Sequence, residues 1–517
     1  QDNGRIGVSI QTDSSEHITL QHGDEISITR LTAIVTSRDT SNLHQFSEEI
    51  LDQLQGKTYI DLLAESKHVW DELWNDFDVE IEGDEYAQLA IRFVSYHLLI
   101  AAPRHDDRVS IGAKSLSGAG YKGHVFWDTE LFMLPPFILS RPEIARNLLM
   151  YRYHNLEGAR KKAAEAGYKG AMFPWESTDT GEETTPRWTL PDKDGKRIRI
   201  WTGDHEQHIS SDIAFAIWLY WQWTGDDDFM RDYGAEIFLD TAVFWASRVE
   251  WNKEQNRYEL NLQIGPDEFH ENINNSVYTN TIVAWHVRHA PIILNWLQHQ
   301  NAAKYEQLRQ LLNIDDTIVD KWNDIADKMY IPRHEALGVY EQFNGYFDLN
   351  YIDVEAYTPR TTSLDTILGH ENTVKSQVIK QADVIMMIAL FGEQLGDREE
   401  LLRNWRIYVP RTAHDSSLSS AIHAWVAARL GLEEEAYDLW IKSAAIDLDN
   451  TKGNVQDGIH AAACGGLRQA IIFGFAGLQL DDNSPQGWTL HPQLPKWWKS
   501  IKFSFYYHGQ KHTVTVE

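Results

Sequence analysis

Apolar residues at helical spacing dominate the chain from about residue 83 to residue 446. Ile209, Ile213, Ile217 and Tyr220 show the pattern, because they recur every three or four positions. Similar stripes occur near 86–101, 142–160, 228–249, 277–298, 376–394, 417–430 and 433–446. We see no fixed sequence period, so a solenoid is not expected. The pattern predicts a mainly α fold, a barrel of helical hairpins with its chemistry in the loops at one end.

The two ends of the chain alternate like β-strands instead. The apolar positions that alternate are Ile6, Val8, Ile10, Ile26, Ile28 and Ile34 near the N-terminus, and Ile501, Phe503, Phe505 and Tyr507 near the C-terminus. We therefore predict four parts: the remnant of a β-sandwich (1–40), a helical linker (41–82), the helical barrel (83–446) and a C-terminal β-domain (447–517).

The charge of the chain restricts its partners. Its 517 residues carry a net charge of −29, which argues against nucleic acid or an acidic membrane surface and favours a neutral substrate. The sequence contains no run of 18 apolar residues that could span a membrane. The single cysteine, Cys464, excludes an internal disulfide and leaves the compartment open, with the cytoplasm favoured. Because the chain begins with Gln1 and shows no secretion signal, we interpret it as a processed or truncated product.

Aromatic residues are abundant, with 20 Trp, 21 Tyr and 19 Phe. Many of them must be core residues. Tryptophan is also well suited to stacking on the apolar face of a sugar ring while its N–H finds a partner. The composition therefore favours a small sugar as the substrate.

Residues 265–271 read Gly-Pro-Asp-Glu-Phe-His-Glu, and they place three carboxylates and a histidine directly after a turn. Clustered carboxylates raise one another's pKa, which is what a general acid needs to deliver a proton to a leaving oxygen. A solvated acidic turn or a Ca²⁺ loop would give the same pattern. Neither EF-hand spacing nor a zinc-binding His pair accompanies it, so we predict no metal and no cofactor.

Several motifs occur in order along the chain and together resemble glycoside hydrolase family 65, which includes disaccharide phosphorylases and related α-glucosidases. They are Gly-Tyr-Lys-Gly-His-Val-Phe-Trp-Asp-Thr-Glu (120–130), Phe-Pro-Trp-Glu-Ser (173–177), Gly-Asp-His-Glu-Gln-His-Ile-Ser (203–210), the acidic turn at 265–271, Tyr-Thr-Asn (278–280), Lys-Gln-Ala-Asp-Val (380–384), His-Asp-Ser-Ser-Leu-Ser (414–419) and Gly-Ile-His (458–460). The resemblance implies an (α/α)6 catalytic barrel, a large N-terminal β-sandwich of which most is missing here, and a small C-terminal β-domain. It also suggests a homodimer.

The resemblance assigns roles to individual residues. Glu268 corresponds to the general acid, and Asp267 or Glu271 could supply the charge that holds its proton. The residues that correspond to contacts of the transferred glucosyl ring are Trp127, Asp128, Lys380 and Gln381. Trp175, Glu176 and Thr202 correspond to the leaving-sugar subsite of the branch acting on kojibiose, an α-1,2-linked glucose disaccharide. Without the resemblance, each of these side chains would read as a structural residue.

The family's reaction inverts the anomeric carbon in a single displacement. An inverting hydrolase needs a second carboxylate about 6.5–9.5 Å from the acid, whereas a phosphorylase needs donors for phosphate. Residues 408–419 contain no glutamate, and Val409 and Ala413 are the positions where a hydrolytic base could have been replaced. The groups that could bind phosphate are His414, Ser416, Ser417 and His460.

Three hypotheses follow. The first is phosphorolysis of a kojibiose-like disaccharide to β-glucose 1-phosphate, with inorganic phosphate as co-substrate. The second is an inverting α-glucosidase on the same substrates, with its base replaced at Ala413 or Val409. The third is a sugar-binding homologue without catalytic activity.

Overall fold

The computed structural model describes residues 5–12, 17–191, 195 and 197–517. By their internal contacts, residues 1–75 and 76–517 form two compact units. The helices of the described part do not combine the length and apolar character needed to cross a membrane.

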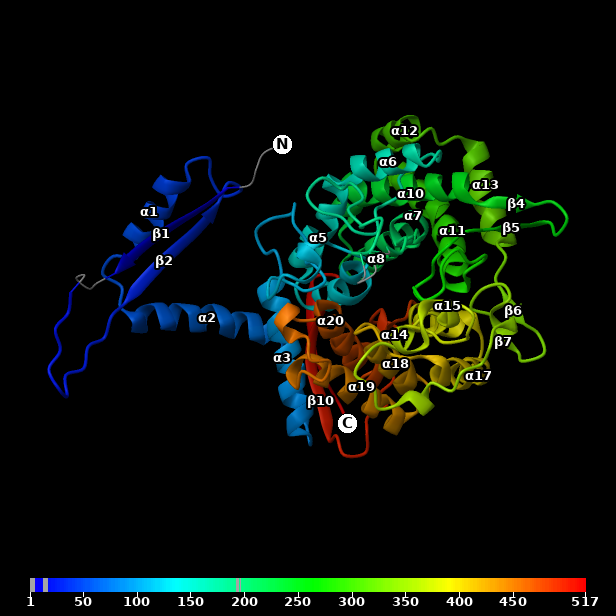
Figure 1. Cartoon of the computed structure of the whole chain (residues 1–517). Coiled ribbons are helices and arrows are strands. Elements are labelled where there is room, and N and C mark those ends of the chain that lie inside the picture. The colour runs from blue at the N-terminus through cyan, green and yellow to red at the C-terminus, as the bar shows by residue number, and fades with distance from the viewer. Residues whose placement is uncertain (1–4, 13–16, 192–194, 196) are drawn as a thin grey trace. The chain divides into compact units, whose positions relative to one another are not determined.

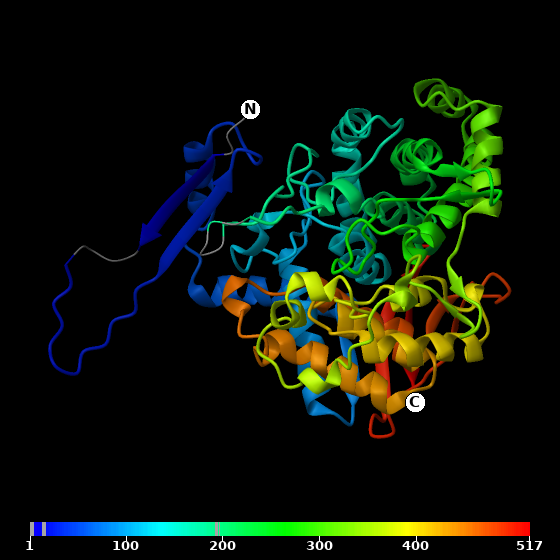
Figure 2. The ribbon, with the colours of Figure 1, turned by 45° about the vertical axis from the view of Figure 1, so that its right-hand side comes forward.

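The first unit contains a two-stranded sheet. Strands β1 (Ile6–Thr12) and β2 (Arg30–Thr36) pair antiparallel, with Val8 opposite Ile34. Helix α1 (Leu43–Gln53) contacts both strands, as Figure 2 shows in blue, and α2 (Tyr59–Phe77) follows. The alternation that we noted at Ile26 and Ile28 lies before the second strand begins. Residues 1–4 and 13–16 of the predicted sandwich remnant lie outside the described residues.

The second unit is built around a closed ring of helices, which confirms the predicted barrel. Within the described residues, six helical segments contact one another in sequence, and the last returns to the first. They are η2 with α4 (Thr129–Met133, Leu134–Ser140), α8 (Ile209–Thr224), α11 (Val277–Gln300), α16 (Val384–Phe391), α18 (Ser419–Arg429) and α20 with η9 (Ala461–Gln469, Ala470–Phe475). Each is predominantly apolar and largely buried, as an inner wall requires.

A second set of helices alternates with the inner ones along the chain and covers the ring. Its members are α3 (Glu85–Ala101), α5 (Pro142–His154), α6 (Leu156–Glu165), α10 (Ala235–Arg248), α12 (Ala302–Leu311), α13 (Asp316–Lys328), α17 (Arg398–Tyr408) and α19 (Glu433–Leu448). Figure 1 shows α8, α10 and α11 side by side in green, and all three contact one another. The inner helices therefore run in one direction and the outer ones return.

This single direction positions the site. The inner helices begin directly after the loops that carry the sequence motifs, so Asp128, His208, Asp383 and His460 all lie at helix N-termini. Backbone N–H groups at these ends are unpaired, and the helix dipole favours negative charge there. The barrel therefore brings its polar residues to one end.

Short elements fill the loops at both ends of the barrel. The helical ones are η1 (Gly120–Gly123), α7 (Thr202–His205), α9 (Asp227–Phe229), η3 (Met230–Gly234), η4 (Tyr346–Asp348), η5 (Glu355–Tyr357), α14 (Leu364–Leu368), α15 (His370–Thr373), η6 (Gly392–Leu395), η7 (Val409–Arg411) and η8 (Val455–Asp457). The extended ones are the hairpins β4–β5 (Glu250–Asn252, Arg257–Glu259), β6–β7 (Arg333–His334, Val339–Tyr340) and β8–β9 (Leu478–Leu480, Trp488–Leu490).

The secondary structure differs from the sequence prediction at two places. Residues 461–475, which we placed in the C-terminal β-domain, are helical and form part of the inner ring. Strand β3 (Val79–Glu82), which lies within the predicted helical linker, pairs with β10 (Ser500–Tyr507), and β10 pairs with β11 (Gln510–Val516). We accordingly propose that the small C-terminal β-domain begins after residue 475 and includes β3.

Glycine explains why residues 461–475 escaped a helical prediction. Gly465 lies in α20 where that helix meets η2, and a Cβ at this position would come within 2.1 Å of the backbone oxygen of Phe132. Glycine therefore permits the close helix contact that closes the ring, although it is a weak helix former.

We predict that Gly465→Ala destabilises the barrel. Alanine normally stabilises a helix by about 1 kcal/mol relative to glycine, but the clash with Phe132 should outweigh this gain by roughly 1–3 kcal/mol. Gly466→Ala is the matched control, because its nearest neighbour is the Ala421 methyl group at 3.0 Å rather than backbone. Thermal unfolding at one scan rate should show a lower midpoint for Gly465→Ala than for Gly466→Ala, and the reverse order would contradict this packing.

Candidate active site

A network around Asp267 holds the loop that carries the predicted acid. The buried Asp267 carboxylate accepts hydrogen bonds from His270 Nδ1 (2.6 Å), Gln342 Nε2 (2.8 Å) and the backbone N–H of Lys380 (2.8 Å). The backbone N–H of Asp267 itself donates to the Asp383 carboxylate at 3.0 Å. Burial lowers the pKa of His270, but the pairing with Asp267 outweighs it and the net shift is upward. The acidic turn is therefore fixed to residues 380–383.

Glu268 projects from this fixed loop towards Lys380. Its Oε1 lies 2.8 Å from Lys380 Nζ, and both side chains are about one quarter exposed. The charge of Glu268 also acts on Asp128, Glu206 and Glu271, whose pKa values burial raises first and Glu268 raises further. Of the two neighbours predicted for Glu268, Glu271 interacts with it, whereas Asp267 is engaged in its own network.

Trp127 and Asp128 lie at the start of the first inner helix. Trp127 is 1% exposed, and its ring packs edge-to-face on His208 at 4.9 Å between centroids. Asp128 is 8% exposed, and burial together with the nearby charge of Glu268 raises its pKa to about 7. Asp128 is therefore close enough to Glu268 for their charges to interact, and Trp127 directly precedes it in the chain.

Gln381 and Asp383 belong to the same layer. Gln381 Nε2 donates to the backbone oxygen of Pro266 at 2.6 Å. In the described structure, Gln381 Oε1 and one Asp383 oxygen have no hydrogen-bond partner although they are buried. Buried polar atoms of this kind are usually satisfied, so these two atoms are available to a ligand that carries hydrogen-bond donors.

Glu206 and His208 were not assigned a role from the sequence. His208 Nε2 and Glu206 Oε1 form a buried ion pair at 3.5 Å, and Glu206 Oε2 has no hydrogen-bond partner in the described part of the chain. Burial raises the pKa of Glu206 well above its usual value. Burial lowers the pKa of His208, but its 2.6 Å contact with Asp212 outweighs this and raises the pKa to about 10. The available signal was the run of charged residues directly before an apolar helix stripe.

The predicted leaving-sugar residues lie next to this layer. Trp175 is 4% exposed, and its ring centroid is 6.2 Å from that of Trp127. Glu176 accepts from His124 Nδ1 at 2.7 Å, and burial raises its pKa. Thr202 is buried at the start of α7. The exposed Tyr121, which we did not single out, interacts electrostatically with Lys380, Glu268, Asp128 and Glu176.

Residues 412–415 run beside Lys380 on the predicted attack side. The backbone N–H of Ala413 donates to Ile379 O at 2.7 Å, and that of Asp415 donates to Lys380 O at 3.1 Å. His414 lies between them with a left-handed φ of 53°. Its Nδ1 is 2.8 Å from Ser419 Oγ, and burial followed by the nearby His423 holds its pKa well below the usual value. His414 is therefore a neutral imidazole.

The two serines follow in the same turn. Ser416 Oγ accepts from the backbone N–H of Leu418 at 3.2 Å, and Ser417 is half-buried. Both lie directly before α18, where an N-terminal helix cap would also lie.

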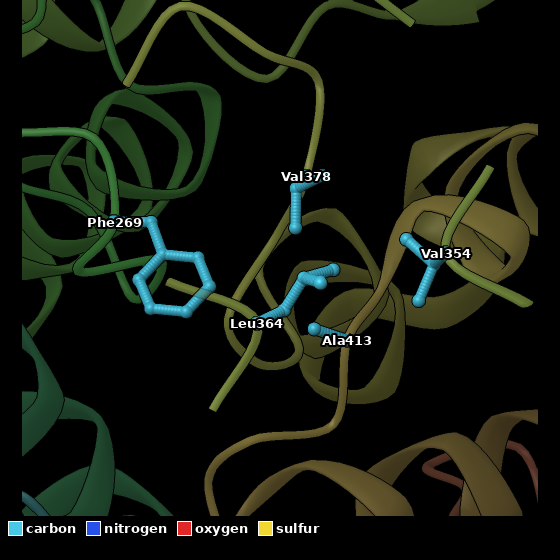
Figure 3. Packing of buried hydrophobic residues seen from close by; sticks show 5 residues of the cluster. All are labelled: Phe269, Val354, Leu364, Val378 and Ala413. Carbon is cyan, nitrogen blue, oxygen red and sulfur yellow. The ribbon is translucent and has the colours of Figure 1, made fainter. Parts of the chain in front are cut away.

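Ala413 and Val409 have surroundings that differ from those of a general base. The Ala413 side chain packs in an apolar cluster with Phe269, Leu364 and Val378, shown in Figure 3. Val409 is half-buried at the end of α17, on the short helix η7. A carboxylate at position 413 would have to lie among these apolar side chains, where its charged form is disfavoured.

Three cations that we did not select from the sequence lie near the 413–416 loop. Lys452 Nζ donates to the backbone oxygen of Asp415 at 2.7 Å, and Arg360 pairs with the Asp415 carboxylate at 2.8 Å. Lys442 is close enough to disfavour the charged forms of Lys452 and His414. Asp415 is occupied on its other oxygen by the backbone N–H of Leu364 at 2.7 Å. These residues come from separate segments, which a single sequence does not place together.

His460 belongs to a separate chain of contacts. Its Nδ1 lies 2.7 Å from Asp447 and its Nε2 lies 2.7 Å from Lys114 Nζ. Both ring nitrogens are engaged, so His460 has no free nitrogen for another ligand. The described residues contain no group of three or more His, Cys, Asp or Glu side chains suited to a metal ion.

Comparisons with known proteins agree with this arrangement. Residues 92–469 match the model of the glycosyl hydrolase family 65 central catalytic domain. The chain is 45% identical to a kojibiose phosphorylase of Halothermothrix orenii, over 92% of this chain and 61% of that protein. It is 44% identical to a kojibiose phosphorylase of Caldanaerobacter subterraneus, over 87% of this chain and 58% of that protein.

A solved structure described as a putative kojibiose phosphorylase from human microbiome matches with a TM-score of 0.89 and 26% identity, over 100% of this chain and 70% of that one. The chain spans about three fifths of the length of the curated relatives it matches. The match to the catalytic-domain model, which covers most of this chain, establishes that the chain belongs to glycosyl hydrolase family 65.

Proposed function

We propose that this protein cleaves the α-1,2 glucosidic bond of kojibiose or a similar disaccharide by inverting phosphorolysis. Glu268 donates a proton to the glycosidic oxygen, and the bond between this oxygen and the anomeric carbon breaks. A phosphate oxygen forms the new bond to the anomeric carbon from the opposite face. The products are glucose and β-glucose 1-phosphate.

The proposed sugar contacts rest on the unpartnered buried atoms near Glu268. Oxygen atoms of Gln381, Asp383 and Glu206 point to a ligand that presents several hydroxyl donors. Trp127 and Trp175 add apolar faces, and sugar rings present such faces too. Asp128 accepts further hydroxyls, and its ionised form gains from them because hydrogen bonds to a carboxylate favour the charged state.

The observation that carries phosphorolysis over hydrolysis is the charge around residues 413–416. Lys452, Lys442 and Arg360 converge there, whereas the nearby Asp415 is paired with Arg360 and a backbone N–H. A cationic surrounding suits an anionic nucleophile, and a water-activating base would instead be a free carboxylate. The similarity to kojibiose phosphorylases supports the same choice. We include Lys452 in the proposed phosphate site together with His414, Ser416 and Ser417.

We expect kojibiose cleavage to require phosphate. Incubation of the protein with kojibiose and phosphate should release glucose and β-glucose 1-phosphate in equal amounts, identified by proton and phosphorus NMR. Without phosphate no sugar should be released. Glucose release that ignores phosphate would identify a hydrolase, and tight kojibiose binding with no product in either buffer would identify a non-catalytic homologue.

Glu268→Gln should abolish turnover and retain sugar binding. Loss of a general acid lowers the rate by about 10²–10⁴-fold, whereas the amide keeps the size of the side chain. Glu271→Gln is the matched control, because it removes a carboxylate from the same loop and should change kcat by less than about tenfold. Steady-state kinetics with calorimetric titration of kojibiose measure both effects. Equal losses in the two variants would remove the assignment of the acid.

We predict that phosphate binding weakens at alkaline pH because Lys452 loses its charge. Burial, with Lys442 and Arg360 nearby, lowers its pKa to about 8, so in the free protein it loses its charge as the pH rises through that value. The KM for phosphate should therefore increase between pH 7 and pH 9. Lys452→Arg keeps its charge over this range and should show a flat profile.

Lys452→Met should raise the KM for phosphate at every pH, and this KM should not increase further between pH 7 and pH 9. The exposed Lys375, paired with Glu371 at 2.8 Å, provides the control Lys375→Met, which should follow the unmodified protein. Because ionisation of phosphate is common to all variants, it cancels in the comparison. An alkaline limb that persists in Lys452→Met would exclude Lys452 from the phosphate site.

The homodimer implied by the family resemblance is part of this proposal. Sedimentation at several protein concentrations tests it directly.

A further inference from the structure

A large hollow lies at the end of the barrel away from Glu268. Its volume is about 830 Å³, and it is lined by residues from all six inner helical segments and by residues 478–493. On α8 the lining positions are Phe215 to Trp223, whereas His208 of the active site precedes the same helix. At the usual rise, Phe215 lies roughly 10 Å and Trp223 roughly 22 Å along α8 from His208. On α8, α16, α18 and α20 with η9 the hollow is therefore lined by the later turns of the inner helices, and its wall reaches back to Glu130 and Leu131 of η2.

Aromatic side chains dominate the wall of this hollow. Trp218 and Trp285 meet at an interplanar angle of 86°, and Phe215 contacts Trp285 at 5.1 Å between centroids. Across the hollow's lining, Trp425 packs on Phe473 at 5.5 Å. Trp218 and Trp285 are each only partly buried, so part of their ring surface stays accessible. Rings of this kind offer flat apolar faces to a ligand.

One buried donor in the wall lacks a partner. Trp425 is 5% exposed, and its Nε1 has no hydrogen-bond acceptor among the described residues. A buried indole N–H normally finds an acceptor. This unsatisfied donor indicates a ligand that supplies an oxygen atom inside the hollow.

The helix ends determine the charge of that ligand. The inner helices end here, so their last carbonyl groups and the negative ends of their dipoles face this side. Arg429 donates to Ala389 O (3.1 Å) and Phe473 O (3.3 Å), and Arg398 donates to Leu430 O. Both arginines thus donate to carbonyl groups at helix C-termini. The negative ends of the helix dipoles would repel an anion. A neutral ligand with hydroxyl donors fits the remaining carbonyls.

We propose that this hollow is a second binding site for a neutral gluco-saccharide, separate from the catalytic site. The apolar faces of its rings lie on Trp218 and Trp285, one of its oxygens accepts from Trp425 Nε1, and its hydroxyls donate to helix-end carbonyls. The proposal does not depend on which nucleophile the active site uses.

Calorimetric titration tests this site in the Glu268→Gln background, where the substrate is not consumed. Kojibiose and maltotriose are the probes. Glu268→Gln alone should bind one of them at two sites per chain. Adding Trp218→Ala should remove one site or weaken it by about tenfold or more, equivalent to about 1.4 kcal/mol. Adding Trp251→Ala, which changes an exposed tryptophan of β4 away from the hollow, should leave both sites intact.

Trp425→Phe is the variant less expected to disturb folding, because it keeps an aromatic ring at this position and removes the N–H. It should weaken the same site, with kcat in an otherwise unmodified protein unchanged. A single class of sites in Glu268→Gln that neither Trp218→Ala nor Trp425→Phe alters would overturn the proposal, whereas a single class that both variants weaken would support it and show that the catalytic site binds neither probe. Two classes that neither Trp218→Ala nor Trp425→Phe alters would also overturn it. Failure of phosphorolysis would not affect either readout, so the two proposals can fail separately.

Discussion

The buried Asp267 carboxylate is the interaction on which the active site depends. It receives four hydrogen bonds, from an imidazole, an amide and two backbone N–H groups, one of which belongs to Lys380. The loop of Glu268 and the loop of Lys380 are thereby one unit, although they are more than a hundred residues apart in sequence. The ion pair between Glu268 and Lys380 follows from this arrangement, because Asp267 holds both backbones at the required spacing. Asp267 therefore determines the position of the proposed acid without being one of the proposed sugar contacts.

Several carboxylates share the end of the barrel where the inner helices begin. Asp128 and Asp383 both have pKa values raised to about 7, and burial is the largest cause in each case. The cost of burying these groups is reduced by helix N-termini, by Lys380 near Asp128, and by the cation of His208 near Asp383. Their hydrogen-bonding capacity is only partly used within the protein. Such a site is prepared for a neutral ligand that carries many hydroxyls.

The helical part of the fold could be predicted from periodicity, and the failures have physical causes. Long stripes such as 277–298 match a single helix, α11, almost residue for residue. The inner helix 461–475 was missed because its contact with η2 requires glycine, which reads as a loop signal. Strand β3 was missed because four residues carry too little alternation to be recognised, and its partner β10 is some 420 positions later. Local patterns cannot reveal pairings at that distance.

The residues of the candidate site also fall into those that the sequence predicts and those that only the fold reveals. Residues inside distinctive motifs, such as Asp128, Glu268 and Lys380, were selected from the sequence, and the structure brings them together. Lys452 and Arg360 occur in unremarkable polar loops, and only the fold shows that they flank residues 413–416. His460 was selected, yet its nitrogens are engaged by Asp447 and Lys114. The pairing of β3 with β10, and of α20 with α4, has a further consequence for biosynthesis. After translation, β3 lacks its partner until about 420 more residues have been made, and α4 until about 320 more, so the nascent barrel stays open along one side and exposes surface that a chaperone can cover.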